Sequence, residues 1–160
     1  MKKLVSMLLV LSGLFVVLAL PASAEGKSAT AYPIVIHMDE PAETIQESLE
    51  RLSYLSSIAT NLTIIDGNAH CQGNYSTAGT RLIRLTMELQ RCSFASSSDS
   101  DWETIKTWTQ SWSTRGTHML TKKFPNISSG WYYRVATTAT VLDGDIPLEI
   151  VKVYSIVRHY

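Results

Sequence analysis

The residues best suited to catalysis are the histidines and cysteines, and their spacing forms no recognised catalytic motif. No histidine pair has the H-x-x-x-H or H-E-x-x-H spacing of a metal site, and no serine lies in G-x-S-x-G. His70 and Cys71 are adjacent, but neighbours on a strand point to opposite faces and cannot form a nucleophile–base pair. We therefore expect no catalytic residue, no metal and no cofactor. The alternative is a site assembled from distant segments around one of His37, His70, His118 and His159.

Residues 1–24 have the pattern of a cleavable secretory signal. Lys2 and Lys3 precede an uncharged apolar run, Leu4 to Leu20, and Pro21 is followed by Ala-Ser-Ala at 22–24. An uncleaved anchor is the alternative, since a membrane span needs about 20 apolar residues. We expect a secreted, extracellular protein that begins at Glu25.

The two cysteines allow two interpretations in an oxidising compartment. A disulfide between Cys71 and Cys92 is the usual one. However, the apolar residues of 83–90 occupy odd positions, so an unbroken strand places Cys92 on the polar face with Glu88 and Gln90. Two free thiols, one of them buried, are the alternative, and both interpretations stay open.

Three acidic turns could supply oxygen ligands to Ca²⁺ if two of them met at one end of the fold. None has the full acidic loop of a strong calcium motif, so ordinary turns are the preferred interpretation. The turns are Asp66-Gly67-Asn68, Asp99-Ser100-Asp101 and Asp143-Gly144-Asp145.

Aromatic residues could form a ligand surface, because a flat ring can stack on a sugar. Of the four tryptophans, at least two should lie in the core of so small a domain. Trp112 ends an expected strand beside a turn, where a side chain can leave the core. Tyr132 and Arg134 share the outward parity of a later strand. The sequence therefore predicts a ligand surface that includes Trp112, Tyr132 and Arg134.

Length and charge restrict the partners. Removal of 24 of the 160 residues leaves 136, the usual size of one domain. Loss of Lys2 and Lys3 changes 14 basic and 14 acidic residues to 12 and 14, a net charge near −2. Nucleic-acid-binding proteins usually carry a basic excess, so we expect no nucleic-acid partner. No second apolar run is long enough to span a bilayer, so we expect no membrane contact after cleavage.

The expected elements divide the mature chain into an arm at 25–55 and a sandwich domain at 56–160. In the arm, a short strand at 32–38 precedes a helix in which Ile45, Leu49 and Leu52 form one apolar stripe. From Ser56 the apolar period becomes two, and turn signals separate short strands. The segment 102–112 also fits a helix, but its β-branched threonines favour a strand. The expected strands are 62–71, 81–91, 102–112, 118–124, 131–142 and 148–157.

This pattern predicts a mainly β fold, an immunoglobulin- or fibronectin-III-like antiparallel β-sandwich with a short N-terminal helix. The segment from Phe124 to Val135 resembles the corner of such sandwiches at which a tyrosine hydroxyl bonds back to the backbone. On this interpretation Trp131, Tyr133 and Val135 face the core, whereas Tyr132 and Arg134 face outward.

The chain also resembles a family of small secreted proteins of Gram-positive bacteria, a domain of unknown function. The resemblance covers roughly residues 56–157 and implies a fold and a compartment but no activity. Trp131 stands where the family more usually has tyrosine, and Cys92 is peculiar to this chain, which weakens the disulfide. The resemblance rests on Cys71-Gln72-Gly73, Leu89-Gln90, Trp102, Ile105, Trp108 and the run 130–135, Gly-Trp-Tyr-Tyr-Arg-Val.

Together these features predict a secreted, non-enzymatic β-sandwich module that binds through its surface. The expected partner is an unknown protein or a cell-wall or glycan ligand. The competing hypothesis is a small extracellular hydrolase, and a histidine hydrogen-bonded to a carboxylate in a concave pocket would favour it.

Overall fold

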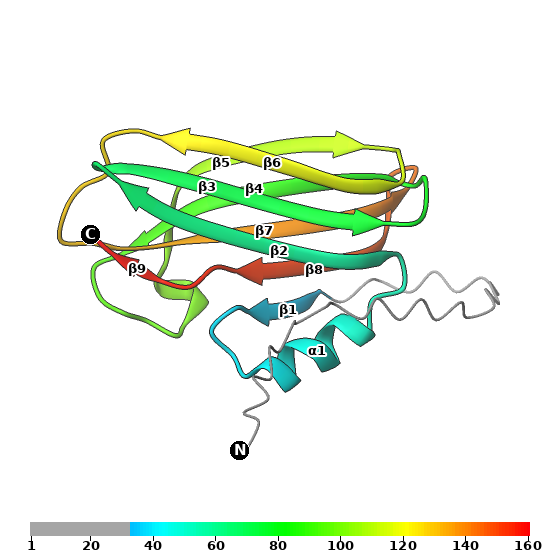
Figure 1. The fold of residues 1–160 in the computed structure, drawn as a ribbon, viewed down its shortest axis with the longest axis horizontal. Helices are drawn as coiled ribbons and strands as arrows, with labels where there is room; N and C mark the ends of the chain where they lie inside the picture. The colour runs from blue at the N-terminus through cyan, green and yellow to red at the C-terminus, as the bar shows by residue number, and fades with distance from the viewer. Residues whose placement is uncertain (1–32) are drawn as a thin grey trace, which may run out of the picture.

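The structure is a computed structural model that describes residues 33–160. The predicted signal peptide, its cleavage site and the beginning of the arm lie outside the described residues. The described chain is a sandwich of two open β-sheets with one short helix, which confirms the predicted fold class (Figure 1). Among residues 33–160 no helix is long and apolar enough to cross a membrane.

The strands form a larger and a smaller sheet. The larger sheet has the order β1-β8-β7-β4-β5, with β9 paired to β7, and the smaller has the order β2-β3-β6. Every pair is antiparallel except β1 with β8, which is parallel. Parallel neighbours need a long connection, and here residues 38–145 lie between the two strands. The elements are β1 (Ile34–His37), α1 (Ala42–Glu50), β2 (Leu55–Ile65), β3 (Asn68–Thr77), β4 (Leu82–Cys92), η1 (Asp99–Asp101), β5 (Glu103–Trp112), β6 (Gly116–Phe124), β7 (Tyr132–Asp143), β8 (Ile146–Tyr154) and β9 (Arg158–His159).

The expected single strand at 62–71 is wrong, because the chain reverses within it. Asp66 and Gly67 join β2 to β3 with φ values of 48° and 70°. A two-residue hairpin turn of this left-handed kind matches the twist of the flanking strands, and Asp-Gly is a preferred sequence for it. The acidic turn 66–68 therefore has a structural role.

Alternating side chains of β4 and β7 fill the space between the sheets, as the period of two predicted. Tyr133 is 1% exposed, and its hydroxyl donates a hydrogen bond of 2.8 Å to the carbonyl oxygen of Ser128. The predicted tyrosine corner is thus present. The residues of β4 and β7 in the core cluster are Ile83, Leu85, Met87, Leu89, Tyr133, Val135, Ala139 and Val141.

The segment 102–112 is a strand, as preferred over a helix. β5 pairs with β4 in a register that shifts between Leu89 and Gln90, so that Ile105 is an extra residue on the β5 side. Such a bulge bends an edge strand and turns a side chain.

The N-terminal segment is joined to the sandwich by β1, by the half-buried apolar stripe of α1 and by the chain just after the helix. Ile36 of β1 is 1% exposed and belongs to the core cluster, whereas α1 buries none of its residues completely. After the helix, the carboxylate of Glu149 accepts hydrogen bonds from the backbone N–H groups of residues 53, 54 and 55. These bonds fix the entry into β2.

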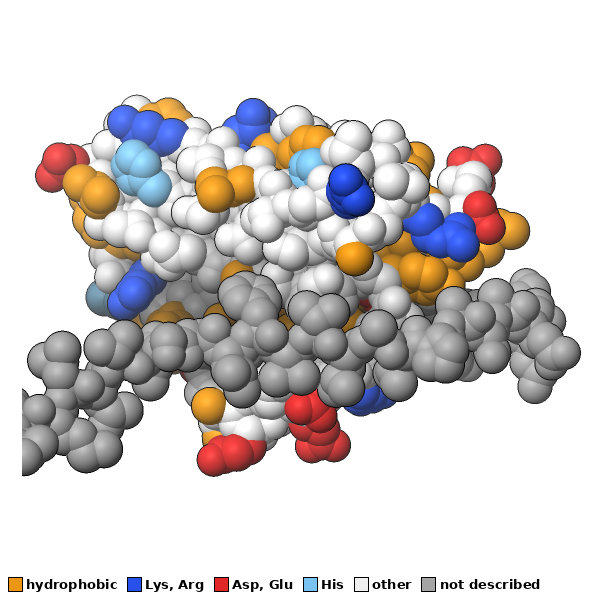
Figure 2. All heavy atoms as spheres, turned by 45° about the vertical axis from the view of Figure 1, so that its right-hand side comes forward, with side chains coloured by type: hydrophobic (Ala, Val, Ile, Leu, Met, Phe, Trp, Pro, Cys, Tyr) orange, Lys and Arg blue, Asp and Glu red, His pale blue; other side chains and the backbone are white. Residues whose placement is uncertain are grey.

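The surface carries both signs of charge. In Figure 2 the charged side chains along the upper edge of the molecule are basic, and the acidic ones lie toward the two ends and below. Uncharged side chains and backbone separate the basic groups, so this face has no continuous basic stripe.

Candidate functional site

The structure does not bring the predicted ligand-surface residues together. Trp112 pairs with Ile83 at one end of β4, whereas Arg134 pairs with Gln90 seven residues further along. At about 3.3 Å per residue this separation is roughly 23 Å. Trp112 also faces the interior, where its indole stacks against His118 with ring centroids 5.3 Å apart. Tyr132 and Arg134 do share the outer face, so only these two lie near one another.

Arg134 lies on the outer face of the larger sheet, as its parity predicted, but it is not a surface residue. It is only 3% exposed. The reason is the segment 93–102 between β4 and β5, which folds back over this face and places Asp99 and Trp102 against the guanidinium. The interpretation of Arg134 as an exposed ligand contact is therefore corrected.

The guanidinium of Arg134 is held by Gln90, Asp99, Trp102 and Tyr154, and we call this group of residues the Arg134 cluster. Its Nε donates to Gln90 Oε1 at 2.8 Å, and its Nη2 donates to Asp99 Oδ1 at 2.9 Å. The guanidinium carbon lies 4.0 Å from the ring centroid of Tyr154 and 4.4 Å from that of Trp102, distances typical of cation–π contacts. The Tyr154 hydroxyl donates to Asp99 Oδ2 at 2.6 Å and closes the network.

The serine-rich segment before β5 is ordered by its own hydrogen bonds. The indole Nε1 of Trp102 donates to the carbonyl oxygen of Ser96 at 3.2 Å, and the Ser96 hydroxyl donates to the carboxylate of Asp101. Serine and aspartate favour such local bonds over strand pairing. Both carboxylates of the acidic turn 99–101 therefore have hydrogen-bond partners, and among residues 33–160 no cluster of three possible metal ligands occurs.

The electrostatics of the cluster keep Asp99 ionised. Partial burial alone would raise the pKa of Asp99, but the hydrogen bonds from Tyr154 and Arg134 and the charge of Arg134 outweigh it and lower the pKa below its ordinary value. Burial, followed by the hydrogen bond to Asp99, raises the pKa of Tyr154. Asp99 is thus a fixed negative charge that balances Arg134.

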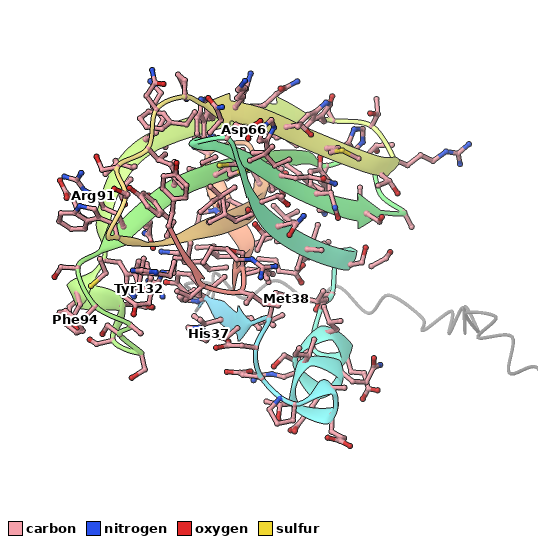
Figure 3. All side chains as sticks on the ribbon, turned by 60° about the vertical axis from the view of Figure 1, so that its left-hand side comes forward. His37, Met38, Asp66, Arg91, Phe94 and Tyr132 are labelled. Atoms are coloured by element: carbon pink, nitrogen blue, oxygen red, sulfur yellow. The ribbon has the colours of Figure 1, made fainter. Side chains whose placement is uncertain are left out.

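A cleft of about 440 Å³ opens beside the cluster, and we call it the Arg134 cleft. Arg134 and Tyr154 lie on its inner side, and the ring of His37 stacks on Tyr154 with centroids 4.6 Å apart and an angle of 19°. In Figure 3 the contributing elements can be followed from His37 on β1, Tyr132 at the start of β7 and Phe94 in the segment after β4. The rim from the β1–α1 connection and from the serine-rich segment includes Asp39, Glu40, Ser96 and Ser97.

The groups that line the Arg134 cleft are suited to ligand binding. Its hydroxyl, imidazole and carboxylate groups can exchange hydrogen bonds with a polar ligand, and Tyr154 and His37 give an aromatic wall. Ser155 also lines the cleft, but its hydroxyl is already hydrogen-bonded to the backbone. Its Oγ accepts a hydrogen bond from the N–H of Val135 at 2.9 Å and donates one to the carbonyl oxygen of Ile156 at 3.2 Å, so it is not positioned as a nucleophile.

Sequence reasoning did not join His37, Gln90, Asp99 and Tyr154 into one site: His37 was one of four candidate histidines, and Asp99 belonged to an acidic turn. Their positions in the sequence span more than 100 residues, and only the register of four strands and one long connection brings them together. One signal was available: an arginine in the middle of the strongly apolar and aromatic run 131–135 needs partners if the strand is covered.

Of the two interpretations left open for Cys71 and Cys92, the structure has the free thiols, and both of them are buried instead of one. Cys71 faces the interior from β3, where burial raises its pKa to about 12. Cys92 has the parity of Gln90 and pairs with Tyr132, so it lies on the outer face of the opposite sheet. The larger sheet therefore separates the two sulfur atoms, and the strand-parity argument is confirmed.

No protein-family model and no curated protein matches the chain. Among solved structures, a β-glucosidase from Kluyveromyces marxianus in complex with glucose is similar over 68% of this chain and 15% of its own, with 9% identity and a TM-score of 0.34. The sporulation control protein Spo0M of Bacillus subtilis is similar over 65% of this chain and 50% of its own, at 13% identity and a TM-score of 0.38. The E. coli curli protein CsgC is similar over 61% and 95%, at 14% identity and a TM-score of 0.32. This chain thus spans only about 15% of the β-glucosidase, and these similarities are too distant to transfer a function.

Proposed function

We propose that this protein is a secreted, non-enzymatic β-sandwich module that binds a surface, wall or protein ligand in the Arg134 cleft. The observation that carries the proposal is the buried guanidinium of Arg134, which is fixed by two hydrogen bonds and two aromatic rings beside an open cleft. A side chain held in this way gives a rigid floor, and rigid floors lower the entropic cost of binding.

Binding is favoured over hydrolysis by the state of the reactive groups. Asp99 is ionised and hydrogen-bonded to two partners, so it is a poor general acid and has little freedom to act as a base. His37 stacks on Tyr154, and within residues 33–160 it has no hydrogen bond to a carboxylate. The hydrolase remains the competing function because His37 shares the cleft with Asp39 and Glu40.

We further infer an immunoglobulin-like architecture. Strands β2, β3 and β6 face β8, β7, β4 and β5, a connectivity that corresponds to the strand pattern A-B-E against G-F-C-C′. The tyrosine corner at the start of β7 supports the same assignment. In such sandwiches binding residues often lie on connections that a rigid scaffold positions, and the segment 93–102 fits this role.

The proposal is tested by filling the Arg134 cleft without touching Arg134. Ser97 is exposed on the rim, so Ser97→Tyr should preserve the fold and reduce co-sedimentation with bacterial cell walls at least about tenfold. Ser93→Tyr is the matched control, because Ser93 is exposed in the same segment but does not line the cleft.

Equal sedimentation of both variants with the parent would refute the Arg134 cleft as the binding site. If the parent itself does not sediment with walls, the wall ligand is wrong and a protein partner becomes the ligand to seek. Release of soluble sugar or peptide from the walls by the parent, lost in His37→Ala, would establish the hydrolase instead. The mass of the secreted protein tests export: it should begin at Glu25, and a membrane-bound chain that retains Met1 would contradict this.

A further inference from the structure

The side of the sandwich opposite β1 and α1 is formed by two unpaired strand edges. Among residues 33–160, β5 pairs only with β4 and β6 only with β3, so that within the described chain each presents one free edge on the upper side in Figure 1. A free edge carries backbone N–H and C=O groups that can pair with a further strand. We call the strip between these edges the β5–β6 seam, defined by Ile105, Lys106, Trp108, Trp112, Lys122 and Phe124.

The bulge in β5 places the side chains of two neighbouring residues, Ile105 and Lys106, toward the β5–β6 seam. Trp108 pairs with the inward-facing Met87, and Lys106 pairs with the inward-facing Leu89. Ile105 is the extra residue of the bulge, and it is half-buried against the core cluster. An apolar side chain and a lysine are thus placed next to each other at a free edge.

The charge of the seam is basic and uncompensated. Lys122 has the parity of the buried Leu120 on β6, so it points from the opposite edge into the same strip. Both Lys106 and Lys122 are exposed, and within the described part of the chain neither forms an ion pair. Basic side chains also mark this upper edge in Figure 2. An acidic partner would complement it.

A second cleft, of about 420 Å³, lies at the Glu103 end of β5 and gives the seam a place for a side chain. Ile105 and Phe124 contribute apolar surface to it from the two edges. Arg91 lies at this cleft, stacked over Trp131 at 4.5 Å and paired with Glu103 at 2.8 Å. The cleft is therefore mainly polar, with Ile105 and Phe124 as apolar parts of its lining and a charged pair on its border.

We propose that the β5–β6 seam binds an acidic, extended peptide segment of another protein, which adds as a strand along the free edge of β5. Backbone pairing supplies affinity in this mode of recognition, and pockets for alternate side chains supply specificity. A polysaccharide is disfavoured because the ring of Trp112 lies against His118 and Trp108 packs on the core, so neither indole is displayed as a free platform. The site is independent of the Arg134 cleft.

The test uses a fluorescent decapeptide of alternating glutamate and valine as the probe, with anisotropy as the readout at low salt. It should bind, whereas an alternating lysine–valine peptide should not. The same acidic peptide methylated on alternate backbone nitrogens keeps its charge but loses half of its N–H donors, so it should bind at least about tenfold more weakly. Amides of β5 should gain protection from deuterium exchange when the acidic peptide is bound.

Two neighbouring lysines give a matched pair of variants. Lys122→Glu reverses a charge that faces the seam and should weaken binding about tenfold at low salt. Lys123 has the opposite parity and pairs with His70 on the outer face, so Lys123→Glu should weaken binding less than about twofold. Near-ultraviolet circular dichroism should show that both variants retain the fold.

Three results would overturn the proposal. Equal binding of the methylated and unmethylated peptides would exclude strand addition and leave a charge effect. Full displacement of the peptide by an anionic polysaccharide, with no protection of β5, would assign the seam to polyanions. If Lys106→Glu and Lys122→Glu cause aggregation without loss of peptide binding, the lysines serve only to keep the free edges from pairing between copies.

Discussion

Replacement of Arg134 by methionine tests whether the cluster fixes the outer face of the larger sheet. Methionine keeps the apolar stem but removes both hydrogen bonds and both cation–π contacts. The buried bond to Gln90 should be worth about 1.5–3 kcal/mol, as for a charged donor. The bond to Asp99 should contribute less to the free energy of unfolding, about 0.5–1 kcal/mol, because the Asp99 side chain is 48% exposed and water can replace the lost partner.

Together with the ring contacts, we expect Arg134→Met to lower the free energy of unfolding by about 3 kcal/mol at pH 7. Arg134→Lys keeps the charge, but its compact ammonium lacks the planar fork that reaches Gln90 and Asp99 from two separate nitrogens, so a loss of about 2 kcal/mol is expected. Urea unfolding followed by tryptophan fluorescence measures both. Arg84→Met is the control: Arg84 is exposed on the outer face of β4 and should cost less than about 0.5 kcal/mol. A loss for Arg134→Met as small as that of the control would refute the cluster.

Three further predictions follow from single contacts. Tyr133→Ala should cost about 3–5 kcal/mol in urea unfolding, and Tyr132→Ala about 1 kcal/mol or less, because only Tyr133 is buried; equal losses would mean that the facing of β7 is wrong. The lowered pKa of Asp99 stabilises the fold above the ordinary aspartate pKa, and this contribution is lost as the pH falls through the folded-state pKa. The difference in unfolding free energy between the parent and Asp99→Asn, measured by urea unfolding at several pH values, should therefore narrow as the pH falls below about 4. Cys71 and Cys92 should resist a thiol reagent in the folded protein and both react in denaturant without reductant; no reaction in denaturant would mean that they are bridged.

Local patterns predicted the parts of the fold that depend on neighbouring residues. The alternation in 83–90 placed β4, and the run 130–135 placed the corner with Tyr133 inward. The same alternation correctly placed Cys92 on the outer face of the larger sheet, with Gln90. Asp66-Gly67 is a visible turn signal, but residues 62–65 before it and 69–71 after it are together no longer than one ordinary strand, which led to the wrong prediction of a single strand.

The Arg134 cluster could not be predicted because it depends on contacts that are distant in the sequence. Parity gives the face on which Arg134 lies but not what covers that face. Asp99 and Trp102 reach it only because the segment after β4 folds back, and Tyr154 only because β8 pairs with β7. The parallel pairing of β1, which brings His37 to Tyr154, likewise has no local signal.

The central claim, that a ligand occupies the Arg134 cleft, is tested most directly by the nuclear magnetic resonance signal of the Arg134 side chain. Its Nε–H is held by Gln90 in a buried position, so it should exchange slowly and give a resolved resonance at neutral pH. In a titration with glycan and peptide fragments released from bacterial cell walls, the account predicts saturable shifts of this resonance and of the His37 ring, and their loss in Ser97→Tyr. Saturable shifts confined to other parts of the chain, with the Arg134 signal unchanged, would contradict it.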